Sequence, residues 1–332
     1  MNNIFKSGNM KILFLRILSS LLTLFLLVSL LFFLIRLSPG DPSDKYISAK
    51  LGNVLSKKVE QEFSLNQPIT QQYISFVSNI FRGELGISYN YHQPVFKVIW
   101  EYFSFTIIFA LLSFSIQISL SIWLAIKVSR KKNRVIEKLT ENLALFVYSI
   151  PAFVLGVVLI LIFSVEIDLL PISGVQSIDY DEMNLLSQLL DLLRHLILPL
   201  ITLSVPGIAM FYKYIKESMD EVVHKTFITN LKSSGVNDKI IFRKHVLPNA
   251  LKPLISVAGV ELGILLGGTL ITEVIFSLPG MGRLAIDSIL SRDYPLVIGC
   301  VFTAGAVVII ANFLADIVKL KVDKRLIRGI LN

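Results

Sequence analysis

Residues 12–35 read ILFLRILSSLLTLFLLVSLLFFLI, and Arg16 is the only charged residue in this run. A helix of roughly 20 apolar residues is long enough to cross a bilayer core about 30 Å thick. Lys6 and Lys11 precede the run, as basic residues precede the apolar part of a signal peptide. The run is too long for such a peptide, however, and no cleavage site with small residues follows it. We therefore interpret residues 12–35 as an uncleaved first membrane span.

Five further apolar runs follow in a chain of 332 residues that is 54% hydrophobic and only 17% charged. A soluble domain of this length would carry more charge on its surface, whereas the mean hydropathy of +0.69 suits a surface that faces lipid. The sequence thus predicts an all-α polytopic membrane protein with six transmembrane helices. The further spans are predicted at about 103–126, 139–164, 194–214, 253–277 and 295–318.

The charged residues of the connecting segments sort into two groups. Residues 127–138 carry six basic residues (Lys or Arg) and one acidic residue. Residues 213–252 carry eight basic and four acidic residues, and residues 319–332 carry five basic residues and one acidic residue. Residues 165–193 carry six acids and no Lys or Arg. Because short basic loops stay in the cytoplasm, we expect both termini and the basic loops to be cytoplasmic. The net charge of +8 is then a topology signal and argues against nucleic-acid binding. The segments expected outside are 36–98, 165–193 and 278–294.

The loop at about 213–252 has the pattern of two short helices joined by a glycine turn. Apolar residues recur every four positions over 223–231 among lysines, which indicates a short amphipathic helix. Two serines and Gly235 end this helix, and the glycine suits a left-handed position after it. The Asn-Asp pair at 237–238 offers a cap for a second helix at about 238–247. An ordinary basic loop at the membrane surface is the alternative interpretation.

Seven strings, spread over the chain in a fixed order, carry a resemblance to a known family. They are RLSPGDP at 36–42, LNQPITQQY at 65–73, GELGISY at 83–89, LLPISG at 169–174, LLRHLILPLITL at 192–203, KHVLPNALKP at 244–253 and ELGILLGGTLITEVIFSLPGMGRLAIDSILSRDYP at 261–295. With these strings the chain resembles, from end to end, the B-type permease subunit of dipeptide, oligopeptide and nickel ABC importers. The basic loop resembles the EAA coupling loop of ABC-importer permeases, because Leu-Pro follows Gly235 twelve and thirteen residues later. Two departures are TNLKSSG at 229–235, which lacks the usual Arg and Ala residues, and Asp-Lys-Arg instead of Asp-Pro-Arg at 323–325.

The resemblance implies the type I ABC importer permease fold and a multi-pass protein of a bacterial or archaeal cytoplasmic membrane. Residues 1–98 would form the first transmembrane helix plus an extracytoplasmic segment, and residues 99–332 a five-helix permease core. The implied function is a permease subunit that forms half of the translocation pathway of an ATP-driven importer for peptides or related small solutes. Nickel or metal–opine chelates are the alternative cargo.

The resemblance also implies partners and the residues that contact them. The partners would be a homologous second permease, two ATPase subunits and an extracytoplasmic substrate-binding protein. Residues 36–98 would either help to receive the binding protein or form a cover over the outer mouth. The chain has no Gly-x4-Gly-Lys-Ser/Thr phosphate loop, so ATP and Mg are expected on the partner subunits and no cofactor on this chain. The residues implied in coupling to the ATPase are Thr229, Asn230, Leu231, Lys232, Gly235, Asp238, Leu247 and Pro248.

The fifth predicted span carries three regularly spaced glycines and two glutamates. Gly259, Gly263 and Gly267 form a small-residue face for close helix packing, a candidate contact with the second permease. At about 100° per residue, Glu261 falls nearly opposite this strip and Glu273 lies nearer to it. Because a carboxylate that faces lipid is costly, each is expected to face protein or water. Each is therefore either a pathway or gate residue or a hydrogen-bonding group that contacts a neighbouring helix or subunit.

Pro279 and Gly280 follow this span directly and break the helix. They form either an outer-gate turn, which the resemblance favours, or a plain external turn. Cys300 lies alone in an apolar run, and the four histidines lack metal-ligand spacing, so no metal site is expected. A membrane-embedded enzyme is disfavoured because no catalytic motif is present, and an ion-coupled secondary transporter because no inverted repeat is evident.

Overall fold

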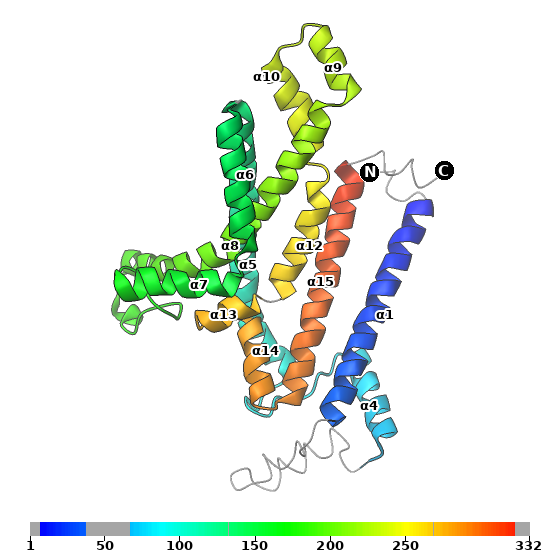
Figure 1. The fold of residues 1–332 in the computed structure, drawn as a ribbon. Coiled ribbons are helices and arrows are strands. Elements are labelled where there is room, and N and C mark those ends of the chain that lie inside the picture. Colours follow the sequence, from blue (N-terminus) through cyan, green and yellow to red (C-terminus); the bar gives the residue numbers. More distant parts are fainter. Residues whose placement is uncertain (1–6, 38–66, 132, 268, 323–332) are drawn as a thin grey trace.

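The computed structural model describes residues 7–37, 67–131, 133–267 and 269–322. Four long helices dominate it: α1 (Ser7–Leu37), α5 (Val95–Lys131), α8 (Leu185–Val223) and α15 (Tyr294–Val322). In the described residues, β-sheet pairing is limited to one isolated bridge between Ile87 and Pro94. The predicted all-helical membrane fold is confirmed (Figure 1). Among the described residues, five helices are long and apolar enough to cross a bilayer, and there are six if the bent pair of residues 134–149 and 152–166 counts as one span.

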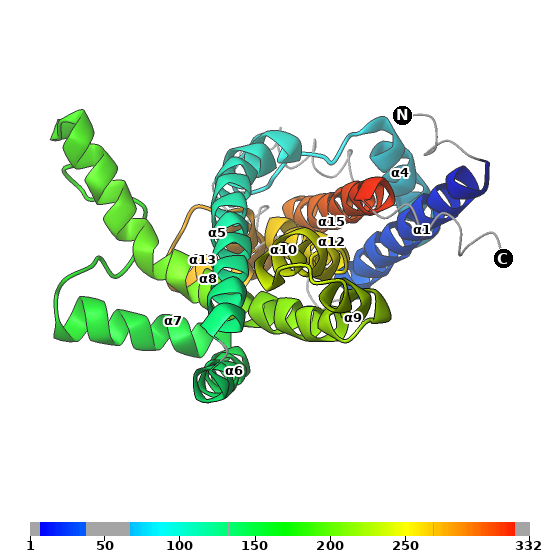
Figure 2. The same ribbon diagram turned by 90° about the horizontal axis from the view of Figure 1, so that it is seen from above.

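The predicted third span, 139–164, is broken rather than straight. Helix α6 (Arg134–Ser149) ends, and α7 (Ala152–Ile160) with the π-helical turn η1 (Leu161–Glu166) leaves at an angle of 93°. The break lies at Ile150, which is extended with φ −78° and ψ 122°, and at Pro151. Proline cannot donate a helical hydrogen bond, and it pushes the preceding residue out of the helical region. Figure 2 shows α7 and the first part of α8 extending to the side opposite α1.

The predicted fifth span, 253–277, is also interrupted. Helix α12 (Leu254–Gly267) is followed by the short α13 (Leu270–Ile275), and Thr269 between them has non-helical angles of φ −83° and ψ 49°. Next along the chain, α14 (Met281–Leu290) precedes α15. The interruption allows α13 and α14 to pack against each other as a separate pair of short helices.

The glycine strip of α12 faces α15 of the same chain. A Cβ added at Gly259 would overlap the Cβ of Ala315, and one added at Gly263 would lie 3.6 Å from the Cβ of Ala311. At Gly267 the nearest atom would be a methyl group of Val308, at 3.2 Å. The strip therefore permits close packing, as predicted, but its partner is a helix of this subunit. It is not a free surface for the second permease.

The N-terminal end of α1 and the C-terminal end of α15 lie at one end of the bundle, together with α9 (Thr226–Ser233) and α10 (Asp238–Ile241) (Figure 1). We call this the α9–α10 end. Helices α4 (Ile69–Arg82) and α14 lie at the opposite end, which we call the α4–α14 end.

Helix α1 is peripheral and is held mainly by α15. Leu24 and Val28 of α1 pack against Ile298, and Arg16 forms an ion pair with Asp316 at 2.6 Å.

We expect Arg16→Ala and Asp316→Ala each to lower the stability of the purified protein by about 1 kcal/mol or less, as measured by thermal unfolding in detergent. The double variant should be no less stable than the less stable of the two single variants, because the ion pair is already lost in each of them. Additive losses would show that the two side chains act independently.

Candidate functional site

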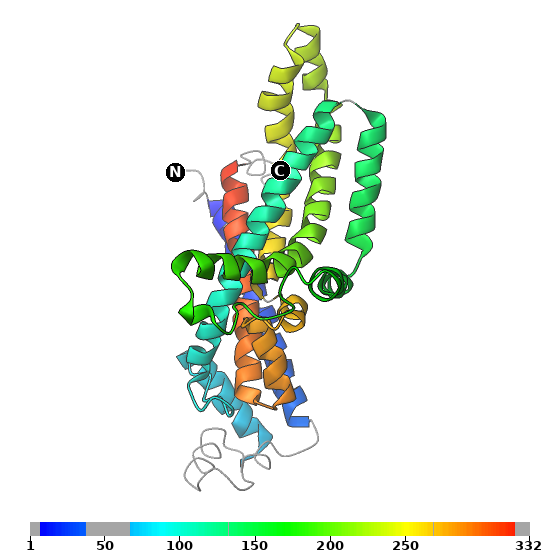
Figure 3. The ribbon, with the colours of Figure 1, turned by 90° about the vertical axis from the view of Figure 1, so that its left-hand side faces the viewer.

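The loop between α8 and α12 forms a helix–turn–helix that projects beyond the other helices at the α9–α10 end (Figure 3). Helix α9 ends in a tight turn in which the N–H of Gly235 donates to the carbonyl of Lys232 at 3.0 Å. The N–H of Val236 donates to the carbonyl of Leu231 at 3.1 Å. This pair of bonds is the Schellman motif, which requires a left-handed residue, and Gly235 has φ +75°. The predicted glycine turn is therefore present.

The second helix begins at a side-chain cap. The Asn237 carboxamide oxygen accepts from the N–H of Lys239 at 2.9 Å, which identifies Asn237 rather than Asp238 as the capping residue. Helix α10 continues through the π-helical turn η3 (Phe242–Val246) into α11 (Leu247–Ala250). The second helical segment thus extends slightly beyond the predicted 238–247.

The helix–turn–helix has a buried side and an exposed side. Ile228 and Ile241 are almost completely buried, in one apolar cluster with Phe211, Ile215 and Met219 of α8. This cluster fixes the turn rigidly to the end of α8. Most residues expected to couple to an ATPase are exposed: Thr229, Asn230, Lys232, Gly235, Asp238 and Pro248. The other two, Leu231 and Leu247, are half-buried and pack against the apolar cluster.

A groove of about 850 Å³ lies between this loop and the adjoining ends of α6 and α8. It is lined in part by Lys216, whose side chain is only 6% exposed and lies 2.5 Å from Glu137 of α6 and 2.6 Å from Asp220 of α8. The two carboxylates compensate the buried ammonium group and join α6 to α8. The sequence did not identify Lys216, because Glu137 belongs to a distant segment. Only the spacing of Lys216 and Asp220, four residues apart on one helix, was visible.

At the α4–α14 end, Glu273 is completely buried and caps α14. Its carboxylate accepts from the backbone N–H of Gly282 at 2.7 Å and of Arg283 at 3.1 Å. The hydroxyl groups of Thr106 and Thr269 donate to its other oxygen at 2.9 and 3.0 Å. An anion at a helix N-terminus is stabilised by the helix dipole and by the unpaired N–H groups there. Of the two interpretations of Glu273, these contacts favour a hydrogen-bonding role over contact with cargo.

Gly280 makes room for this carboxylate. A Cβ on Gly280 would overlap the carboxyl group of Glu273. The adjacent Met281 N–H donates to the hydroxyl of Thr106 at 2.8 Å, so that α5, α13 and α14 meet at one hydrogen-bonded junction. Pro279 lies in the turn that leads into this junction and is half-buried. Glu261, on α12, is also half-buried, and its carboxylate has no hydrogen bond or ion pair to another described residue.

A Ser, an Asp and a His do come together near the start of α8. The backbone N–H and the hydroxyl of Ser177 donate to Asp191 at 2.8 and 2.6 Å. The Nδ1 atom of His195 lies 3.5 Å from the same carboxylate. A hydrolytic triad instead needs His between Ser and Asp, so this set pins a loop to α8 and is not arranged as a nucleophile and its base. Among the described residues, no group of His, Cys, Asp and Glu could hold a metal ion.

These features define a polytopic helical membrane protein with a rigid loop that projects from one end of its bundle. Residues 117–328 match the family described as binding-protein-dependent transport system inner membrane component. Residues 9–110 match the corresponding N-terminal model of binding-protein-dependent transport system membrane components. The chain therefore belongs to the family of binding-protein-dependent transport system inner membrane components.

Named relatives match the chain over nearly its whole length. A probable peptide ABC transporter permease protein of Sinorhizobium fredii is 28% identical, over 94% of this chain and 97% of its own length. The glutathione transport system permease protein of Escherichia coli is 30% identical, over 91% of this chain and 94% of its own length. The nickel import system permease protein of Staphylococcus aureus is 27% identical, over 93% of this chain and 90% of its own length. The prediction that this chain is a permease subunit of an ABC importer is confirmed.

Proposed function

We propose that this subunit forms half of the translocation pathway and receives its energy through the loop around Gly235. The working assembly would contain a homologous second permease, two ATPase subunits that bind ATP and Mg, and an extracytoplasmic substrate-binding protein. Both termini and the α9–α10 end would lie in the cytoplasm. Residues 1–98 would supply the first span with its extracytoplasmic segment, and residues 99–332 the permease core.

One observation carries this proposal. The turn around Gly235 is exposed on its polar side, while Ile228 and Ile241 anchor its apolar side to α8. When two ATPases close on ATP, a force on a flexible loop would be absorbed by the loop. A force on this turn would instead move α8, and with α8 the helices α5 and α6 that pack against it.

Peptides are the proposed cargo, and nickel or a metal–opine chelate is the second candidate. Two of the three relatives carry peptide or glutathione in their names, and glutathione is itself a peptide. The third is a nickel permease, which keeps the second candidate open. We propose that Glu261, a half-buried carboxylate without a described partner, is the pathway residue that contacts this cargo.

Transport measurements test the assembly and its cargo. The chain should be purified with its ATPase, second permease and binding protein, and reconstituted in liposomes. We expect ATP-dependent uptake of labelled peptides that requires the binding protein, with labelled nickel as the parallel measurement. Uptake that is driven by an ion gradient and unaffected by ATP would contradict the proposal.

Gly235→Pro is expected to uncouple ATP hydrolysis from uptake in these liposomes. Proline holds φ near −65° and has no N–H, so it can neither take the φ of +75° nor make the bond to Lys232. Gly235→Asn is the matched control, because asparagine tolerates the left-handed region and no atom lies within 4 Å of an added Cβ. Proline should abolish most of the uptake while hydrolysis and membrane insertion persist, and asparagine should retain uptake. Normal transport by the proline variant would show that the coupling assignment is wrong.

A further inference from the structure

Helix α4 has three faces with different surroundings. Its first face packs on α1: the ring of Phe76 stacks on Phe32 with centroids 4.8 Å apart. On the same face, a hydrogen bond of 2.8 Å joins the hydroxyl groups of Tyr73 and Ser29. Ile80 adds to the apolar cluster between α1, α4 and α15. This face fixes the position of α4 and its rotation about its own axis.

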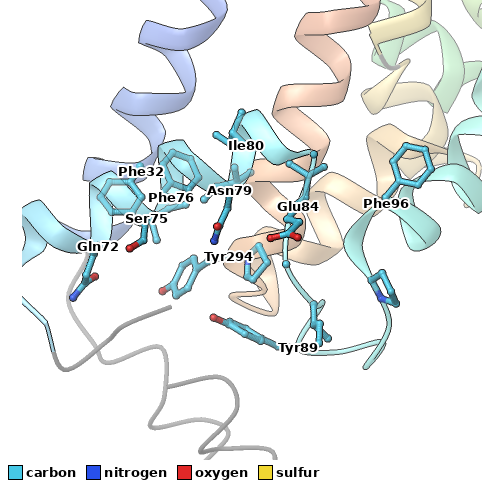
Figure 4. A pocket seen from close by; sticks show the side chains of 18 of the residues that line it. Phe32, Gln72, Ser75, Phe76, Asn79, Ile80, Glu84, Tyr89, Phe96 and Tyr294 are labelled. Atoms are coloured by element: carbon cyan, nitrogen blue, oxygen red, sulfur yellow. The ribbon is translucent and has the colours of Figure 1, made fainter. Parts of the chain in front are cut away.

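The second face of α4 is polar and faces a cavity of about 460 Å³ at the α4–α14 end. Gln72, Ser75 and Asn79 line this cavity from α4, and Tyr294 at the start of α15 lines it from the other side (Figure 4). At about 100° per residue these three side chains share one side of the helix. The polar side of α4 thus faces the cavity, which residues at the end of α1 also line.

The third face of α4 is apolar but contacts little of the protein. Ile74 and Phe81 are 67% and 81% exposed, and the half-buried Val77 lies between them on the same side of the helix. Leaving a large apolar side chain in water rather than burying it forgoes about 1.5–3 kcal/mol. Because the first face is already used against α1, packing within the described chain does not explain this third face.

The third face continues an apolar surface that belongs to a membrane span. Helix α1, on which α4 packs, has exposed leucines along its length, including Leu30, Leu34 and Leu37 near α4. At the same end, the first turns of α5 expose Phe96 and Trp100, which stack on each other. Aromatic residues at the ends of spans are typical of the boundary between hydrocarbon and lipid headgroups.

We propose that α4 lies in the bilayer surface, with Ile74, Val77 and Phe81 inserted among lipid headgroups and the first acyl carbons. Helices of this kind insert their apolar side about 5–10 Å into the boundary and keep their polar side in water. The exposed Arg82 at the end of α4 is placed to contact lipid phosphate. With the orientation proposed above, the leaflet is the extracytoplasmic one. The inference depends on the membrane fold and is independent of the transport assignment.

Fluorescence quenching tests this placement. In a Cys300→Ala background, Ile74→Cys, Phe81→Cys and the matched control Asn79→Cys would each be labelled with a polarity-sensitive dye and reconstituted as full-length protein in liposomes. We expect spin-labelled lipids to quench the dye at positions 74 and 81 several-fold more than at 79, and aqueous iodide to show the reverse order. Iodide quenching at 74 and 81 equal to that at 79 would overturn the proposal, because the face would then be open to water.

Protection of positions 74 and 81 from both quenchers would also overturn it, because protein rather than lipid would then cover the face. A second measurement avoids the effect of a bulky dye. Phe81→Trp keeps an aromatic ring, and its added fluorescence should be quenched by brominated lipids. Failure of this quenching in a correctly inserted protein would count equally against the proposal. None of these results depends on uptake, so they are separable from a failure of the importer assignment.

Discussion

Gly280→Ala is expected to disrupt the junction of α5, α13 and α14. The added methyl group would occupy the position of the Glu273 carboxyl group, which is completely buried and accepts four hydrogen bonds. The backbone at Gly280 has φ −107° and ψ 167°, which any residue can adopt, so the obstacle is this overlap rather than backbone strain. Each buried donor that loses its acceptor costs about 1–3 kcal/mol, so a total loss of about 3 kcal/mol or more is expected. Thermal unfolding of the purified protein measures it.

A double variant separates the overlap from other effects at this junction. Glu273→Ala alone should also destabilise the protein, because it leaves the N–H groups of Gly282 and Arg283 without their acceptor. Once the carboxylate is gone, adding Gly280→Ala should cost little more. If the two losses add fully, the alanine at 280 acts through something other than Glu273. Uptake measured on the surviving protein would show whether α14 also affects transport.

Gly259→Ala is the second change with a large expected effect. Its methyl group would overlap the Cβ of Ala315, and neither atom can rotate away because both are bonded directly to a helix backbone. Helices α12 and α15 would have to separate, and such overpacking costs about 1–3 kcal/mol. The thermal unfolding temperature of the purified protein and the yield of inserted protein should both fall.

Two further variants give the controls for this prediction. Gly263→Ala, one turn along the same strip, places its Cβ at an ordinary contact distance of 3.6 Å from Ala311 and should change stability little. Ala315→Gly combined with Gly259→Ala moves the methyl group from one helix to the other and should restore most of the lost stability. A double variant as unstable as Gly259→Ala alone would contradict this account of the contact.

The sequence predicted the spans well and their breaks poorly. Apolar runs identify spans because length and hydropathy are local properties. Proline, by contrast, has no single outcome in a membrane helix. Pro151 ends α6, whereas Pro199 and Pro206 lie inside the continuous helix α8. Neighbouring helices decide whether the backbone groups freed by a proline find new partners, and the sequence does not show those neighbours.

The helix–turn–helix around Gly235 was determined by the sequence itself. A Schellman turn and an asparagine cap need only residues within a few positions of one another, so their pattern can be read directly. Glu273 and Lys216 are the opposite case. Their partners Thr106 and Glu137 lie far away in the chain, on other helices, and contact them only after the spans have packed. The sequence therefore predicted the apolar spans and the form of the loop, whereas only the tertiary structure decided which partners the buried charges and the glycines contact.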